Sequence, residues 1–208
     1  MGPTLTIRDG EADTAAIAEY ERSRRELVTR GLALGGAVVA AGAVPLLLAV
    51  RGAFAQAESD RDVLEAAIAL ERRAVVAYTA AADSGKLGGT EPIARVFAGQ
   101  EQEHADGLTK ALTDLGGSVP SSKSTEPEQV SGLTRAVRGD ARDILVFTVE
   151  LEAMAVAAYY DAQGKLEAAE LIATVGSIMG NQAQHLVVLR QALARDPSPH
   201  AFVTGSLE

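Results

Sequence analysis

Two glutamates and two histidines form two pairs with the same spacing in this sequence. The distance along the chain from Glu71 to His104 equals the distance from Glu152 to His185. Both glutamates lie in apolar stretches, which read "AIALERRAVVAY" and "FTVELEAMAVAAY". Burying a carboxylate in such surroundings is costly unless it is paired or bound to a metal ion. The four residues are therefore candidates either for metal ligands or for a structural polar core.

A third glutamate stands on the helical face of the first histidine. Glu101 and His104 form the sequence "EQEH", and residues three apart lie on one face of a helix. At the corresponding place before His185 the chain carries Gln182.

Several nearby residues are expected to have structural or solvent-facing roles. Tyr78 and Tyr159 each follow a candidate glutamate by nearly two helical turns, so we expect them to pack in the core and to hydrogen-bond the glutamates, with a radical or redox role as the alternative. Glu103 and Glu150 are expected to face solvent. Met154 and Met179 are expected to fill the core, and His200 is expected to be exposed in the tail.

The elements that must position these residues are four long helices with a repeat. Apolar periodicity predicts helices over about 60–83, from a cap at Thr90 to about 115, over about 140–163 and over about 166–194. "LERRAVVAY" at 70–78 matches "LEAMAVAAY" at 151–159, and the same offset of 81 superposes His104 on His185. A duplicated helical hairpin predicts a four-helix bundle whose corresponding positions face one another, with a polar connection over 117–138.

The composition agrees with an all-α fold and excludes several functions. Alanine is abundant, aromatic residues make up 4%, and no cysteine is present. This excludes disulfides, thiolate zinc sites, iron–sulfur clusters and thiol catalysis. The net charge is −9, and neither a basic patch nor a Gly-rich phosphate loop is found, so nucleic acid is not expected as a partner.

A Glu from each of two helices with Glu-x-x-His from the other two is a di-iron or di-manganese arrangement. Through "VFAGQEQEHADGLTKALTDLGG" and "LIATVGSIMGNQAQHLVVLRQAL" the chain resembles the ferritin-like superfamily, especially exported bacterial ferritin-like domain proteins. The resemblance covers about residues 60–195. It implies a ferritin-like four-helix bundle that holds Fe or Mn as a mono- or dinuclear centre. The implied ligand positions are Glu71, Glu101, His104, Glu152 and His185.

Gln182 departs from that pattern, which expects a glutamate three positions before the last histidine. Four carboxylates would balance two divalent ions, whereas three leave one positive charge uncompensated. An amide oxygen is also a weaker ligand than a carboxylate. We therefore expect either one tight metal, or two metals assisted by solvent or a small anion.

The N-terminal segment 1–55 has the organisation of an export signal. Arg24 and Arg25 precede an uncharged run over 31–50, and Ala53-Phe54-Ala55 forms an A-x-A cleavage pattern. The segment resembles a bacterial twin-arginine signal, which implies the twin-arginine export machinery as a partner. An uncleaved membrane anchor is the alternative, since about 20 uncharged residues can just span a bilayer. We thus expect a signal over 1–55 and a bundle with a short polar tail over 56–208. The bundle would act in the periplasm, outside the cell or at the envelope, with membrane contact only through the N-terminal segment.

Three functions fit these features: a redox protein using Fe or Mn, a non-enzymatic metal-binding protein of the cell envelope, and a metal-free structural or stress-related bundle. Gln182 favours the second. A ferritin cage is not expected, because the segment 196–208 is too short for a further helix. A homodimer is compatible with the pattern. Whether the protein is an enzyme is left open.

Overall fold

The computed structural model describes residues 7–8, 11–12, 44–119 and 126–205. The chain divides into two compact units, Met1–Val39 and Ala40–Glu208. In the first unit, β1 (Ile7–Arg8) and β2 (Glu11–Ala12) form a short antiparallel pair with Ile7 opposite Ala12. The predicted twin-arginine motif lies outside the described residues.

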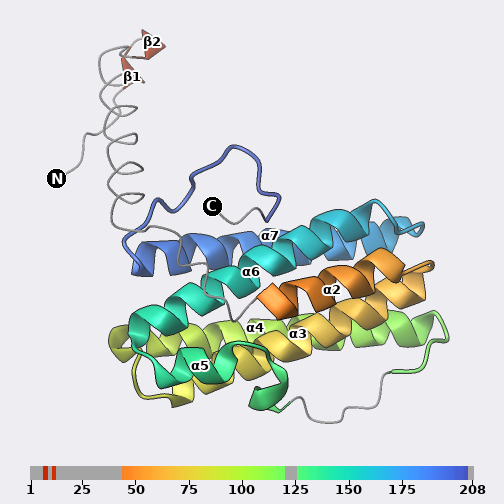
Figure 1. Ribbon diagram of the computed structural model, residues 1–208. Helices are drawn as coiled ribbons and strands as arrows, with labels where there is room; N and C mark the ends of the chain where they lie inside the picture. The colour runs from red at the N-terminus through yellow and green to blue at the C-terminus, as the bar shows by residue number, and fades with distance from the viewer. Residues whose placement is uncertain (1–6, 9–10, 13–43, 120–125, 206–208) are drawn as a thin grey trace. The chain divides into compact units, whose positions relative to one another are not determined.

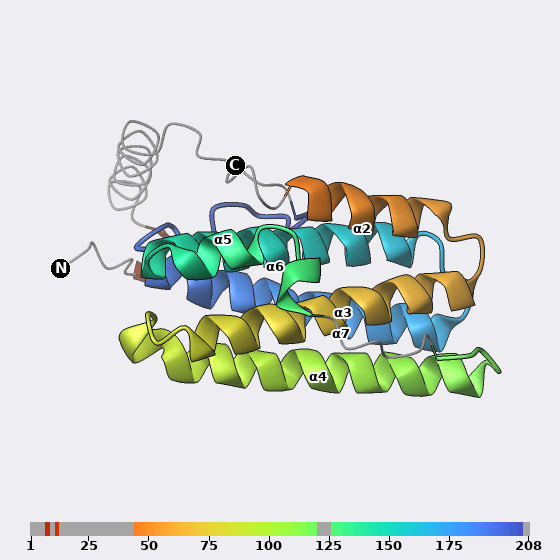
Figure 2. The ribbon, with the colours of Figure 1, turned by 60° about the horizontal axis from the view of Figure 1, so that its bottom comes forward.

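The second unit is built around two helical hairpins, as predicted. Helices α3 (Asp60–Asp83) and α4 (Glu91–Asp114) form the first, and α6 (Ala141–Gln163) and α7 (Ala169–Ala192) form the second. The partners in each hairpin lie side by side along their length (Figures 1 and 2). The predicted all-α bundle of two helical hairpins is thereby confirmed.

Side-chain caps determine where two of these helices begin. Ser59 accepts a hydrogen bond from the Asp62 amide at the start of α3, and Asp140 forms a reciprocal capping box with Asp143 at the start of α6. Thr90 occupies the predicted N-cap position of α4, with a proline in the first turn of the helix. It also ends the short 3-10 helix η1 (Gly88–Thr90), and its hydroxyl donates to the Leu87 carbonyl at 2.8 Å instead of to an amide of α4.

The connection between the hairpins is more ordered than its polar composition indicates. It contains the 3-10 helix η2 (Pro127–Gln129) and the helix α5 (Leu133–Arg138). Val130, Leu133 and Ala136 are buried against the bundle. The Lys86 ammonium donates to the carbonyls of residues 137, 138 and 139 at 2.6–2.9 Å, which ties the end of α5 to the turn after α3.

A further helix, α2 (Val44–Gln56), packs on α3 and α6 (Figure 1). Val50 and Phe54 are buried, and the Lys165 ammonium donates to the carbonyls of Phe54 and Ala55 at 2.6 and 2.8 Å. The helix therefore holds the predicted cleavage pattern and reaches the predicted boundary between residues 55 and 56. Among the described residues, no helix is both long enough and apolar enough to cross a membrane.

Helix α6 is the most deeply buried of the long helices. Every residue from 147 to 159 is buried. A helix that is apolar on all sides must be covered on all sides. Besides α2, the C-terminal tail contributes to this cover: a Cβ atom on Gly205 would lie 2.2 Å from the Ala153 carbonyl oxygen, so only glycine fits there.

Candidate metal centre

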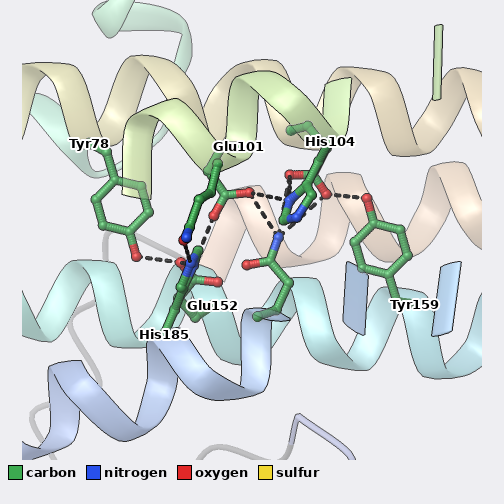
Figure 3. Close-up of polar contacts among 9 residues, drawn as sticks. Tyr78, Glu101, His104, Glu152, Tyr159 and His185 are labelled. Carbon is green, nitrogen blue, oxygen red and sulfur yellow. Dashed lines mark hydrogen bonds and ion pairs between the residues drawn. The ribbon is translucent and has the colours of Figure 1, made fainter. Parts of the chain in front are cut away.

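All six predicted site residues meet at the middle of the bundle. Each long helix contributes: Glu71 from α3, Glu101 and His104 from α4, Glu152 from α6, and Gln182 and His185 from α7. Five of them are buried with at most 1% of the residue exposed, and only the His104 side chain reaches 14%. Figure 3 shows the labelled carboxylates and imidazoles directed toward one another.

The carboxylates and imidazoles form two overlapping triads that share Glu101. In one triad, the His104 Nδ1 atom lies 3.1 Å from Glu101 Oε2 and 3.6 Å from Glu71 Oε2. In the other, His185 Nδ1 lies 3.0 Å from Glu152 Oε1 and 3.1 Å from Glu101 Oε1. The candidate ligand atoms of each triad all lie within 4.8 Å of one another. Glu101 thus offers one oxygen to each side, as a bridging carboxylate would.

Gln182 occupies the position that the repeat assigns to a second such carboxylate. Its Nε2 atom donates to Glu101 Oε2 at 2.9 Å and lies 3.3–3.4 Å from both oxygens of Glu71. Its Oε1 atom is buried and has no hydrogen-bond partner in the described part of the chain. The Gln182 amide therefore donates hydrogen bonds to the surrounding carboxyl oxygens. A glutamate at this position could donate only when protonated.

Each tyrosine bonds the glutamate of the opposite hairpin. Tyr78 donates to Glu152 Oε1, and Tyr159 donates to Glu71 Oε1. The predicted hydrogen bonds to the glutamates are thus present, but they cross between the hairpins, so that each tyrosine helps to hold the two together. Figure 3 shows the two rings on opposite sides of the carboxylate cluster.

Sequence reasoning missed two residues beside His185. Gln100 Oε1 lies 2.6 Å from His185 Nε2, and the Phe97 ring stacks on the imidazole with centroids 3.8 Å apart. No pattern within α4 marks Gln100 as part of the site. The repeat was the available signal, since it places Gln100 and Asn181 at equivalent positions beside the two candidate triads.

The predictions for the flanking acids have different outcomes. Glu103 is exposed, as predicted. The prediction that Glu150 faces solvent is wrong: only 8% of this residue is exposed. The error has a clear cause, because the helix that carries it is covered on all sides rather than along one stripe.

Burial and mutual contacts shift the proton affinities of the cluster. Burial raises the pKa of Glu71 well above its usual value and that of Glu152 to about 7. Burial opposes ionisation of Glu101 as well, but its close contacts with the two histidines outweigh it and lower the pKa of this carboxyl.

The pKa values of the two histidines are raised, although burial alone would lower them. Burial disfavours their charged forms, yet the neighbouring carboxylates outweigh it and raise the pKa of His104 to about 10 and that of His185 to about 9. Protons on the two histidines thus balance the negative charge of the neighbouring carboxylates in the metal-free chain. A bound cation would displace these protons.

The donor set fits a divalent transition metal. Three carboxylates and two imidazoles are hard and borderline ligands, which suit Fe, Mn or Zn and not Cu(I). Two buried oxygen atoms inside the cluster accept no hydrogen bond from the described residues: Gln182 Oε1, and Glu101 Oε1, whose close partner is the His185 Nδ1 atom of the ion pair at 3.1 Å. Buried acceptors are normally hydrogen-bonded, and ligation of a cation would satisfy both oxygens.

Comparison with known proteins identifies the family of this domain. A family model described as "Ferritin-like domain" matches residues 59–195, which include all four long helices and every residue of the cluster. The chain therefore belongs to the family of ferritin-like domains. Searches of curated proteins and of solved structures found no match.

Proposed function

We propose that this chain is a metal-binding ferritin-like protein of the cell envelope that holds Fe or Mn at the centre of its bundle. The observation that carries the proposal is the position of Glu101. This buried carboxylate lies within 3.1 Å of the Nδ1 atoms of both histidines, while Glu71 and Glu152 flank it.

The surrounding residues support a binding role. The tyrosines hold Glu71 and Glu152 in place across the hairpin interface, and Phe97 covers His185. When bound, Fe or Mn would supply redox chemistry toward peroxide or oxygen. Gln182 contributes no negative charge, so the cluster is suited to holding metal more than to the four-carboxylate chemistry of a di-iron oxidase.

A metal-free structural bundle is the second candidate. It is favoured by one observation: Tyr78, Tyr159 and Gln182 already bond the carboxylates without a metal ion. A hydrogen-bonded polar cluster can specify one arrangement of a core by itself.

Elemental analysis separates the two candidates. The chain is purified without chelators, reconstituted anaerobically with Fe²⁺ or Mn²⁺, and compared with His104→Ala and His185→Ala variants. Bound Fe or Mn that depends on these histidines supports the metal-binding function. A chain that holds no metal after reconstitution leaves only the structural bundle.

The proposed location rests on the sequence of the N-terminal segment 1–55. We expect export through the twin-arginine machinery, and an Arg24→Lys, Arg25→Lys variant should remain in the cytoplasm. The intact mass of the exported chain decides between a cleaved signal and an anchor. Cleavage after Ala55 would require α2 to leave the bundle, because Phe54 is 2% exposed and contacts the ring of Tyr159 edge-on at 6.4 Å. A retained α2 would support the anchor alternative.

A further inference from the structure

We propose that the two triads are unequal: Glu101, Glu152 and His185 form a prearranged tight metal site, whereas Glu71, Glu101 and His104 bind a second ion weakly. They are called the His185 triad and the His104 triad below. This inference rests on the proposed metal-binding function. It concerns the residues of this chain that distinguish one triad from the other.

The His185 imidazole is held in a ligating orientation from outside the triad. Gln100 offers its amide oxygen to His185 Nε2 at 2.6 Å, so the Nε2 atom carries the proton of that bond. The Nδ1 atom, which faces Glu152 and Glu101, is then the nitrogen that offers its lone pair when a cation displaces its proton. An outer partner of this kind fixes both the tautomer and the ring orientation of a metal-binding histidine. Phe97 stacks on the same ring at 3.8 Å and restricts its rotation.

The His104 imidazole lacks equivalent support from the described residues. The repeat places Asn181 at the position of Gln100, and asparagine is one methylene shorter. The Asn181 Oδ1 atom is buried and finds no hydrogen-bond donor in the described part of the chain. The His104 side chain is also 14% exposed, against 2% for His185. Its ring is therefore less restrained and closer to solvent.

Gln182 obstructs the His104 triad alone. Its Nε2 atom lies 2.9 Å from Glu101 Oε2, the oxygen that also faces His104, and 3.3 Å from Glu71 Oε2. The NH₂ group is therefore the end of the amide that faces these oxygens in the metal-free chain. A cation among these oxygens would require the amide to turn and present Oε1. By contrast, Glu101 Oε1, the oxygen that serves His185, accepts no hydrogen bond from Gln182.

Titration of the metal-free full chain with Mn²⁺ tests the inequality directly. We expect one Mn²⁺ to bind per chain at least about 10-fold more tightly than a second, measured by calorimetry. At one equivalent, electron paramagnetic resonance should show the signal of an isolated Mn²⁺ ion. Two ions of equal affinity, or a coupled pair at low occupancy, would overturn the inference but leave the metal-binding function intact. If neither Mn²⁺ nor Fe²⁺ binds, the proposed function fails and the inference fails with it.

Matched substitutions at the repeat-related positions identify which triad is the tight one. Gln100→Leu should weaken the first Mn²⁺ by roughly 10–100-fold, the usual effect of losing an outer-shell partner. Asn181→Leu should leave the first Mn²⁺ unchanged. The opposite result would assign the tight site to His104 and contradict the proposal.

Gln182→Glu provides a gain of binding that does not depend on a damaged variant. The added carboxylate should tighten the second Mn²⁺ and produce a coupled spectrum at two equivalents, with little change in the first. If the second affinity does not change, Gln182 is not the residue that weakens the His104 triad, and that step of the inference is wrong.

Discussion

The two hairpins repeat one another in sequence but contribute differently to the bundle. The α3–α4 hairpin supplies two carboxylates and one imidazole, whereas the α6–α7 hairpin supplies one carboxylate, one amide and one imidazole. The α3–α4 hairpin also provides Gln100, the outer partner of the histidine on α7, and among the described residues it receives no such partner in return. Duplication thus accounts for the positions of the candidate ligand groups in the bundle. Sequence differences at two repeat-related positions account for the differences between the two hairpins.

Burial separates the hairpins in a second way. Helix α3 shows exposed and half-buried positions along its length, as expected for an amphipathic bundle helix. Helix α6 is buried from residue 147 to 159, where α2 and the C-terminal tail contribute to its cover. Three sets of variants and a change of pH test these contrasts, beginning with the variant that should have the largest effect.

Removing the shared ligand should abolish binding in both triads at once. In Glu101→Gln, each histidine loses its common carboxylate partner, so we expect a loss of metal affinity greater than the roughly 10–100-fold that an outer-shell change causes. Elemental analysis after reconstitution measures it. Glu103→Gln is the matched control, because this acid is exposed on the same helix. One tightly held ion remaining in Glu101→Gln would show that Glu101 is not shared.

Truncating the contact between α2 and the bundle should destabilise the chain. Phe54 is 2% exposed, and Phe→Ala changes in cores cost about 3–5 kcal/mol. We expect a value toward the lower end for Phe54→Ala, because α2 packs on the outside of the bundle. Urea unfolding of the full chain measures the change. Phe202→Ala is the control: this residue is 83% exposed and should change stability by less than about 0.5 kcal/mol. Equal effects of the two variants would mean that α2 contributes nothing to the fold.

The crossed tyrosine bonds should contribute equally to the two hairpins. Tyr78→Phe and Tyr159→Phe each remove a donor from a buried carboxylate, and we expect each to lower the free energy of unfolding by about 1–3 kcal/mol. Tyr160→Phe serves as the control, since that residue is 54% exposed. A double variant whose effect differs from the sum of the two would reveal coupling through the carboxylate cluster.

The pH dependence of the metal-free chain should report the two histidines. Their pKa values are raised to about 10 and about 9 in the folded chain, against 6.5 for an unperturbed histidine. Between pH 6.5 and about 10 the folded state binds more protons than the unfolded state. This contribution to the free energy of unfolding is therefore fully present below pH 6.5 and is lost as the pH rises toward 10. Thermal unfolding across this range measures the fall. A metal-loaded chain has released those protons and should not show it. A metal-free chain whose stability does not change over this range would argue against charged histidines in the cluster.

Much of this arrangement could be predicted from local patterns. The bounds of α3 followed from apolar periodicity. The matched Glu–His spacings placed four site residues on the inner faces of the four helices, the spacing of three residues from Glu101 to His104 added the fifth, and the repeat added Gln182. The error at Glu150 has a clear cause. Its exposure was judged from its own segment, whereas the cover over α6 depends on other parts of the fold.

Local sequence was enough to specify the helices, their duplication and the faces that carry the ligand candidates, because helical periodicity links spacing to direction. Packing was needed to establish which tyrosine bonds which glutamate and which histidine gains an outer partner. These contacts join residues 74 to 88 positions apart in the chain, on different helices. Spacing within a helix carries no information about which residues of a neighbouring helix lie opposite it. The packing of the two hairpins sets this axial alignment. It thereby creates the difference between two sites that the repeat alone would make equal.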